Sequence, residues 1–96
     1  MTEVFVKLMN KGLKFHEHDK FSFETTDGAT VRDLIDDLRE AFSERFEPYL
    51  ADKSTGKLKR DAIVLVNGKN MVAHQGEKTK LSRGDLIVFM IAAVGG

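Results

Sequence analysis

The chain has 96 residues, a length typical of one domain, and such a domain buries roughly 60–65% of the surface that its unfolded chain exposes. Its 15 basic and 15 acidic side chains give a formal net charge of zero. Because phosphate contacts need clustered positive charge, this balance argues against a dedicated nucleic-acid binder. Cysteine is absent, which excludes disulfides, thiolate zinc sites, catalytic thiols and a persulfide carried on this chain.

No segment resembles a membrane-targeting sequence. The start of the chain lacks the basic, apolar and small-residue order of a signal peptide. The longest apolar run, Leu86 to Val94, is far shorter than the ~20 residues that a spanning helix needs. We therefore expect a soluble cytoplasmic protein that forms a single domain over residues 1–96.

The zero net charge hides an asymmetry between the two halves of the chain. Residues 1–48 carry 11 acidic and 7 basic side chains, whereas residues 49–96 carry 4 acidic and 8 basic ones. Two explanations remain open. The halves attract each other within the fold, or they form a surface of mixed polarity that orients a partner.

Two neighbouring strands are predicted at the start of the chain. Over residues 3–9, Val4, Val6 and Leu8 recur at every second position, which is typical of a strand with one buried face. Residues 20–25 predict a second short strand with Phe21 and Phe23 on one face. A polar loop joins the two segments, so we expect a hairpin.

The strongest local signal is a helix that begins after Thr30. Thr30 is a typical N-cap, and Asp33 three residues later completes a variant capping box. The apolar residues that follow recur at spacings of three and four, and they are Val31, Leu34, Ile35, Leu38, Ala41 and Phe42. We expect this stripe to be buried against a sheet.

The region after the helix shows no long periodic pattern. Phe46, Tyr49 and Leu50 fit a short second helical turn around Pro48, and residues 53–57 fit a turn. A structureless loop over all of residues 43–61 would be unusual in a compact domain, so we expect local packing there.

The last third of the chain predicts two further apolar strands. Residues 62–66 are continuously apolar, which is typical of a buried central strand. Asn67-Gly68 is a turn signal, Met71-Val72 fits the start of a very short strand, and residues 81–85 fit a second turn. Residues 86–91 form the other apolar strand.

The order of these elements predicts an α+β fold. One main helix on one face of a mixed sheet is the stable arrangement for such a set. A single long helix after a hairpin suits the β-grasp, in which the first and last strands lie parallel at the centre of the sheet. We expect residues 92–96 to form a flexible tail.

Candidate catalytic and metal-binding motifs are weak. Ser54-Thr55-Gly56-Lys57 resembles the end of a phosphate-binding loop, but Ala51 and Leu58 break that motif. Asp36 and Asp37 are adjacent on the helix and point apart, so they do not form an acid/base pair. Residues 16–19, His-Glu-His-Asp, together with His74 are a possible metal site, but solvated loop residues are the favoured interpretation.

The most informative feature is the final Gly95-Gly96, directly after an apolar strand. Glycine has no Cβ, so a partner can close tightly around its backbone. A terminal glycine carboxylate is unhindered, and once activated by ATP it can accept sulfur or a lysine amine. From these two residues alone, a flexible chain end made of two small residues without a function is an equally good explanation.

A wider resemblance favours the first explanation. Residues 61–68, residues 81–89 and the Val94-Gly95-Gly96 end resemble, in sequence and spacing, the ubiquitin-like sulfur-carrier family. The family includes the small subunit of molybdopterin synthase, the thiamine-pathway carrier, the small archaeal modifiers and the ubiquitin-related modifier of tRNA thiolation. Ile91-Ala92 stand where the molybdopterin branch commonly has Pro-Pro, and in this respect the tail is similar to the tRNA-thiolation modifier.

The resemblance implies a β-grasp carrier and not an enzyme. Gly96 would be adenylated by a separate activating enzyme that uses ATP, and Gly95 would give access to it. The carrier itself would bind no cofactor or metal. A thiocarboxylate on Gly96 would pass sulfur to a pterin, a tRNA or a thiazole through an acceptor such as the large subunit of molybdopterin synthase. Alternatively, the product would be an isopeptide bond to a target lysine.

Alternation in the last strand predicts a partner-binding surface. We expect Ile87 and Phe89 to face the helix. The outer face would then carry the apolar residues Leu86, Val88, Met90, Val64 and Val66, and Val94 would extend it into the tail. Either partners dock on this patch or residues 43–61 cover it. The alternative function is a ubiquitin-like binding module that uses the same face and never modifies its terminus.

Overall fold

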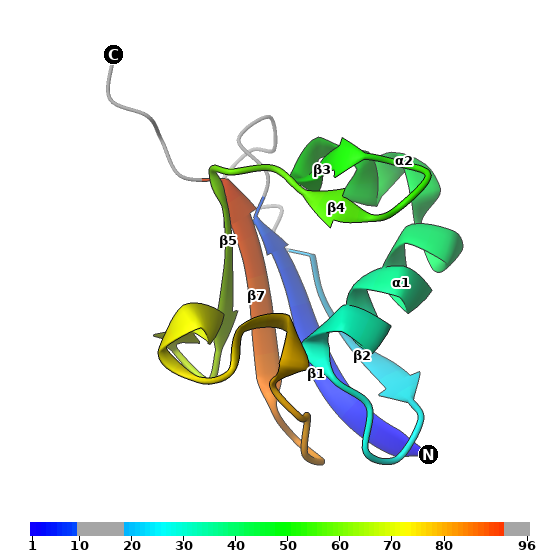
Figure 1. Ribbon diagram of the computed structural model, residues 1–96. Coiled ribbons are helices and arrows are strands. Elements are labelled where there is room, and N and C mark those ends of the chain that lie inside the picture. Colours follow the sequence, from blue (N-terminus) through cyan, green and yellow to red (C-terminus); the bar gives the residue numbers. More distant parts are fainter. Residues whose placement is uncertain (10–18, 92–96) are drawn as a thin grey trace.

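The computed structural model describes residues 1–9 and 19–91 (Figure 1). Its main sheet consists of β1 (Thr2–Met9), β2 (Asp19–Thr25), β5 (Ala62–Val66), β6 (Lys69–Asn70) and β7 (Leu86–Ile91). A two-stranded sheet consists of β3 (Leu50–Asp52) and β4 (Lys57–Leu58). The helical elements are α1 (Val31–Ala41), α2 (Ser43–Phe46) and the 3-10 turns η1 (Glu47–Tyr49), η2 (Met71–Ala73) and η3 (Gly76–Lys78).

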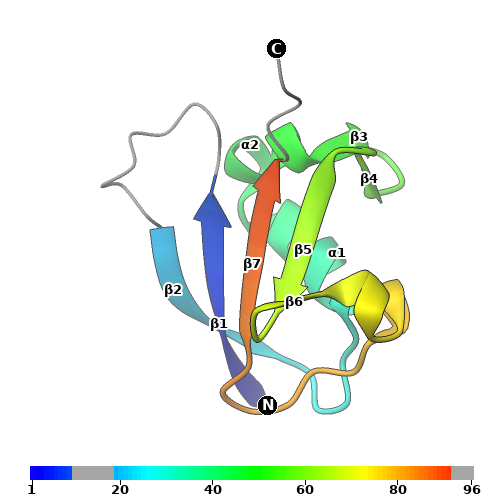
Figure 2. The same cartoon turned by 90° about the vertical axis from the view of Figure 1, so that its left-hand side faces the viewer.

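The main sheet is mixed and has the strand order β2-β1-β7-β5-β6. β1 and β7 pair in parallel at its centre, and the other neighbours are antiparallel. The two views show α1 on one face of this sheet (Figures 1 and 2). The predicted hairpin, the parallel central pair and the α+β β-grasp architecture are confirmed. In the described part of the chain, no helix has the length and apolar character needed to cross a bilayer.

Helix α1 begins where its capping residues predict. The amide of Asp33 donates to Oγ1 of Thr30 at 3.2 Å, and the amide of Thr30 donates to Oδ2 of Asp33 at 3.0 Å. The two bonds satisfy donors that the first helical turn leaves open. The helix ends at Ala41, with Phe42 as its C-cap, so Ala41 is exposed while the earlier apolar residues of the stripe are buried.

The core lies between α1 and the inward side of the sheet. Helix and sheet contribute the buried side chains Val31, Leu34, Ile35, Leu38, Val4, Val6, Leu8, Val64, Val66, Ile87 and Phe89. Residues 43–50 close one end of this core, because Phe46 and Tyr49 are fully buried and their ring centroids lie 5.1 Å and 6.0 Å from that of Phe89. The local packing predicted for this segment is confirmed.

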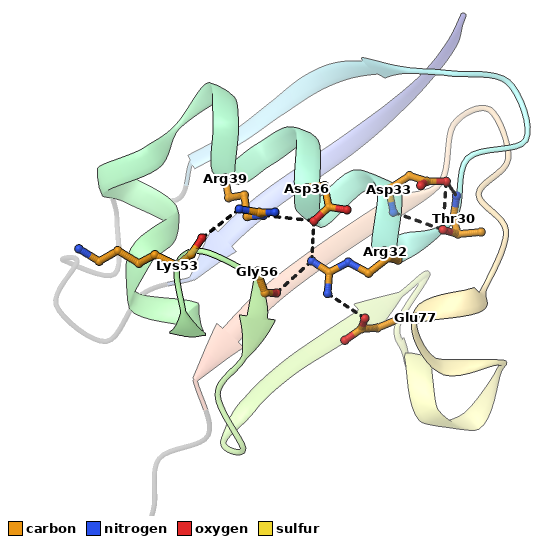
Figure 3. A network of polar contacts seen from close by, with 8 residues as sticks. All are labelled: Thr30, Arg32, Asp33, Asp36, Arg39, Lys53, Gly56 and Glu77. Carbon is orange, nitrogen blue, oxygen red and sulfur yellow. Dashed lines mark hydrogen bonds and ion pairs between the residues drawn. The ribbon is translucent and has the colours of Figure 1, made fainter.

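Two arginines of α1 hold the β3–β4 hairpin against the helix (Figure 3). Nη2 of Arg32 donates to the carbonyl of Gly56 at 2.9 Å, and Nη1 of Arg39 donates to the carbonyl of Lys53 at 2.9 Å. Oδ1 of Asp36 accepts from both arginines, at 2.8 Å and 3.1 Å. Because both guanidinium groups are anchored on one carboxylate, they present fixed donors to the hairpin backbone. We call this cluster the arginine clamp.

Two predictions on the strands after α1 are wrong. β5 is not central: it is the fourth strand of five, and β6 pairs only with Leu65 and Val66. Among the described residues, the other edge of β5 therefore has no strand beside 62–64. The short strand expected at Met71 lies two residues earlier, because the side chain of Asn70 accepts from the amide of Val72 and caps a 3-10 turn there.

Candidate docking surface and the tail that follows it

The face of the main sheet that points away from α1 carries a group of apolar residues over β1, β7 and β5, and Figure 2 views the sheet from this side. We call its apolar residues the outer patch, and they are Phe5, Met9, Ile63, Leu65, Leu86, Val88 and Met90. Their place follows from the pairing register, because directly paired residues share a face. All are half-buried except Val88, which is 8% exposed.

The outer patch is arranged in rows across the strands. Met90 of β7 is paired with Met9 on one side and with Ile63 on the other. One row further from the tail, Val88 lies between Lys7 and Leu65, and these neighbours explain its low exposure. The patch thus crosses three strands at the centre of the sheet, and a continuous apolar surface of this kind is typical of a protein interface.

The placement of Val64 and Val66 on this surface is wrong. Val64 pairs with Phe89 and Val66 pairs with Ile87, so both valines share the face that α1 covers. They are 1% and 3% exposed and belong to the core. The neighbours Ile63 and Leu65 lie on the outer face instead. Because side chains alternate between the two faces of a strand, an error of one residue in the register places every residue of the strand on the opposite face. The expected orientations of Leu86, Ile87, Val88, Phe89 and Met90 agree with the structure.

Residues 43–61 do not cover the outer patch. Phe46 and Tyr49 of this segment pack on Phe89, which lies on the core face of β7. The β3–β4 hairpin that follows is held to α1 by the arginine clamp, on the same side of the sheet as the helix (Figure 3). Of the two alternatives for the outer face, burial under this segment is therefore excluded.

The three tail residues predicted to matter, Val94, Gly95 and Gly96, lie outside the described residues. The structure shows where the tail begins, because β7 ends at Ile91 and pairs there with Ala62, the first residue of β5. The outer patch leads directly to this point through Met90. A partner that docks on the patch at this end consequently meets the start of the tail.

The structure does not support the other two candidate motifs, the metal site and the phosphate-binding loop. His16 and His18 lie outside the described residues, His74 is exposed, and residues 1–9 and 19–91 contain no group of three or more residues suited to hold a metal. Residues 53–56 form the β3–β4 turn, in which the amide of Gly56 donates to the carbonyl of Asp52. Its backbone amide is thus used within the turn and is not presented to a phosphate.

The sequence interpretation missed four residues of the outer patch, namely Phe5, Met9, Ile63 and Leu65. A signal for Phe5 and Met9 was present, because both are apolar residues at positions where an alternating strand with a solvated face carries polar ones. For Ile63 and Leu65 the continuous apolar run gave no such signal. Only the pairing with β7 decides which of its residues face outward.

The fold and this surface define a class of protein: a ubiquitin-like β-grasp domain with an exposed apolar sheet face beside the start of its C-terminal tail. Within that class the chain belongs to the ThiS family, whose profile matches residues 8–96. The family predicted from the sequence is therefore confirmed. No curated protein sequence matches the chain.

Solved structures share the ubiquitin-like β-grasp fold of this chain. The SAMP1 protein of Haloferax volcanii superimposes with a TM-score of 0.77 at 21% identity, over 98% of this chain and 99% of that one. A putative molybdopterin converting factor subunit 1 of Pyrococcus furiosus has a TM-score of 0.68 at 23% identity, over 97% and 100%. A chain of the Amycolatopsis orientalis BexX/CysO complex has a TM-score of 0.66 at 28% identity, over 97% and 99%.

Proposed function

We propose that this protein is a ubiquitin-like carrier whose Gly96 carboxylate is activated by a separate adenylating enzyme. The observation that carries the proposal is the match to the ThiS family, which extends through residue 96 and so includes Gly95 and Gly96. The outer patch supports it, because the patch gives an enzyme a docking surface that ends where the tail starts. In this role the chain is a co-substrate, and ATP is bound and consumed by the enzyme.

The proposed chemistry takes place on the Gly96 carboxylate. One of its oxygens attacks the α-phosphorus of ATP and expels pyrophosphate, which leaves an acyl-adenylate. Hydrosulfide, as the sulfur donor, then displaces AMP and gives a thiocarboxylate. Alternatively, a lysine amine displaces AMP, loses a proton and gives an isopeptide bond. The sulfur acceptor, in molybdopterin synthesis or tRNA thiolation, receives the sulfur from this carrier. The small size of the glycines matters here, because a partner must close around their backbone.

The experiment is an incubation of the native, untagged protein with ATP and the activating enzyme of the same genome. Mass spectrometry should detect an adenylate on Gly96 and, after addition of a sulfur donor, the replacement of one oxygen by sulfur. Deletion of Gly96 should abolish the reaction and leave the thermal unfolding midpoint unchanged. Gly95→Val should also block it, because a branched side chain stiffens the backbone and obstructs a narrow channel. Failure of the matched enzyme to form any adenylate would refute the carrier function.

A second candidate function is a binding module that is never activated. The outer patch favours it as much as it favours the carrier, because the patch provides an interface without any reaction at the terminus. The two functions differ in their requirement for a free Gly96 carboxylate. A C-terminal tag should abolish the function of a carrier and spare that of a binding module.

A further inference from the structure

The outer face of the β1–β2 hairpin carries an unusual charge arrangement. Glu3 is paired directly with Glu24, and four residues further along β1, Lys7 is paired directly with Lys20. Between these pairs lies the neutral pair of Phe5 and Ser22. Like charges directly opposite each other on one face of a sheet destabilise the pairing of the strands. Both charged pairs of this face are therefore of the unfavourable kind.

The two pairs do not neutralise each other. They are separated by four residues along a strand, about 13 Å, which exceeds the Debye length of about 8 Å at physiological ionic strength. None of the four side chains has an ion-pair partner among the residues that the structure describes. The hairpin face thus has an acidic end and a basic end.

The basic end is held at the outer patch. Nζ of Lys20 lies 5.8 Å from the centroid of the Phe5 ring, within range of a cation–π contact. Lys7 is paired on its other side with Val88, at the centre of the patch. The next row in the direction of the tail contains Met9 and Met90. The lysine pair is consequently on the half of the surface nearest to the tail, and the glutamate pair is on the far half.

Ion pairs within the fold do not account for the difference in charge between the acidic first half and the basic second half of the chain. Among the described residues, the single ion pair that joins an acid of residues 1–48 to a base of residues 49–96 is that of Glu47 with Lys53. The explanation that the halves simply attract each other therefore has little support. A polar surface that orients a partner agrees better with the register of β1 and β2.

We infer that the Glu3–Glu24 and Lys7–Lys20 pairs orient the activating enzyme on the outer patch. The enzyme surface that fits has carboxylates opposite the lysine pair, near the channel that receives the tail, and cations opposite the glutamate pair. Charge complementarity of this kind accelerates association and suppresses the reversed orientation, in which like charges would meet. The inference rests on the proposed function and adds to it the polarity of the partner. A nucleic acid does not fit, because its phosphates would meet the glutamate pair.

The test exchanges charges without a change in composition. The double variant Lys20→Glu/Glu24→Lys converts both like-charge pairs into opposite-charge pairs. It should raise the thermal unfolding midpoint by a few degrees. The same variant should lower the rate of association with the activating enzyme by roughly threefold or more at low salt, and high salt should remove the difference. A variant that is more stable than the wild type and yet associates more slowly with the enzyme is the result expected if the charged pairs serve docking.

A fourfold variant separates docking from stability. Glu3→Lys/Lys7→Glu/Lys20→Glu/Glu24→Lys restores two like-charge pairs with the ends exchanged, so its midpoint should return to that of the wild type. Its association should be the slowest of all, because every charge now opposes the enzyme. Lys80→Glu is the control, since this exposed residue bridges to Thr30 on the helix side and its reversal should leave association unchanged.

The outcomes distinguish this inference from the proposed function. Wild-type protein that neither binds the matched enzyme nor forms an adenylate overturns both. Wild-type protein that is activated normally, with charge variants that associate at the wild-type rate, overturns the orienting role alone. A wild-type dimer in analytical ultracentrifugation that the double variant abolishes would also overturn it, because the charged pairs would then serve a second copy of this chain.

Discussion

Gly56→Ala probes the arginine clamp that holds the β3–β4 hairpin to α1. Gly56 has a φ of +76°, a left-handed conformation that costs a residue with a Cβ about 1–2 kcal/mol. The new Cβ would also lie 2.5 Å from Nε of Arg39 and 2.6 Å from Nη2 of Arg32, so both guanidinium groups must move. Their hydrogen bonds to the carbonyls of Gly56 and Lys53 would be lost at about 0.5–1.5 kcal/mol each. We expect a total loss of about 2–5 kcal/mol.

The assay is thermal or denaturant unfolding beside a matched control. The expected loss lowers the unfolding midpoint of a domain of this size by roughly 8 °C or more. Gly68→Ala is the control, because Gly68 has a φ of +86° but a Cβ added there would meet no other atom within 4 Å. This variant incurs the backbone strain alone, so Gly56→Ala should be the less stable of the two by about 1–3 kcal/mol.

Equal losses in the two glycine variants would refute the role of the clamp. A double-mutant cycle adds a second check, because Arg32→Ala should cost clearly less in the Gly56→Ala background than in the wild type. Additive effects of the two substitutions would mean that the arginine keeps its contacts when the alanine is present. The alanine would then leave the clamp intact, and the cost of Gly56→Ala would be backbone strain alone.

Helix α1 and the outer patch can be tested by three further substitutions. Thr30→Ala removes the acceptor for the amide of Asp33 and should cost about 1 kcal/mol in denaturant unfolding, with an unchanged midpoint as the contrary result. Met90→Asp should leave the protein folded, as judged by circular dichroism. It should weaken partner binding, because an interface would bury the new charge without an ion-pair partner. If the variant unfolds, Met90 does not face outward as the strand register indicates. Burial and the neighbouring carboxylates, Asp33 first, raise the pKa of Asp37. Asp37→Asn should therefore raise the midpoint near neutral pH. The gain should shrink as the pH falls through that raised pKa and disappear below the ordinary pKa of an aspartate, because Asp37 of the wild type is then protonated in both the folded and the unfolded state. A gain that persisted at low pH would assign the effect to something other than charge.

The elements with a clear period were predictable from the sequence, and the continuous apolar run was not. The capping residues and the three-and-four spacing located α1 to within a residue, because each signal acts within one turn of the helix. β5 offered five apolar residues in a row, and either set of alternate residues could face the core. The choice is made by the register with β7, a contact between strands distant in sequence. Val64 and Val66 were misplaced for that reason.

The candidate site shows the same limit in another form. The Gly95-Gly96 end and the family resemblance could be recognised from the sequence, because both are local patterns of residues. The like-charge pairs of β1 and β2 were not, since Glu3 and Glu24 become neighbours only through the antiparallel register. The arginine clamp was likewise hidden, because Arg32 and Arg39 act on backbone carbonyls that carry no sequence signal.

The central position of β7 has a consequence for how the protein is made. β7 is the last strand of the described chain, yet it lies between β1, the first strand, and β5. The sheet cannot close until residue 91 has been synthesised and released for pairing, and the pairing of the two ends is a long-range contact of the kind that slows folding. Until then β1 and β5 each present an unpaired edge, which is a site of aggregation. A shortage of chaperones or a premature stop within 86–91 should therefore appear as insoluble protein, and a stop after residue 91 should not.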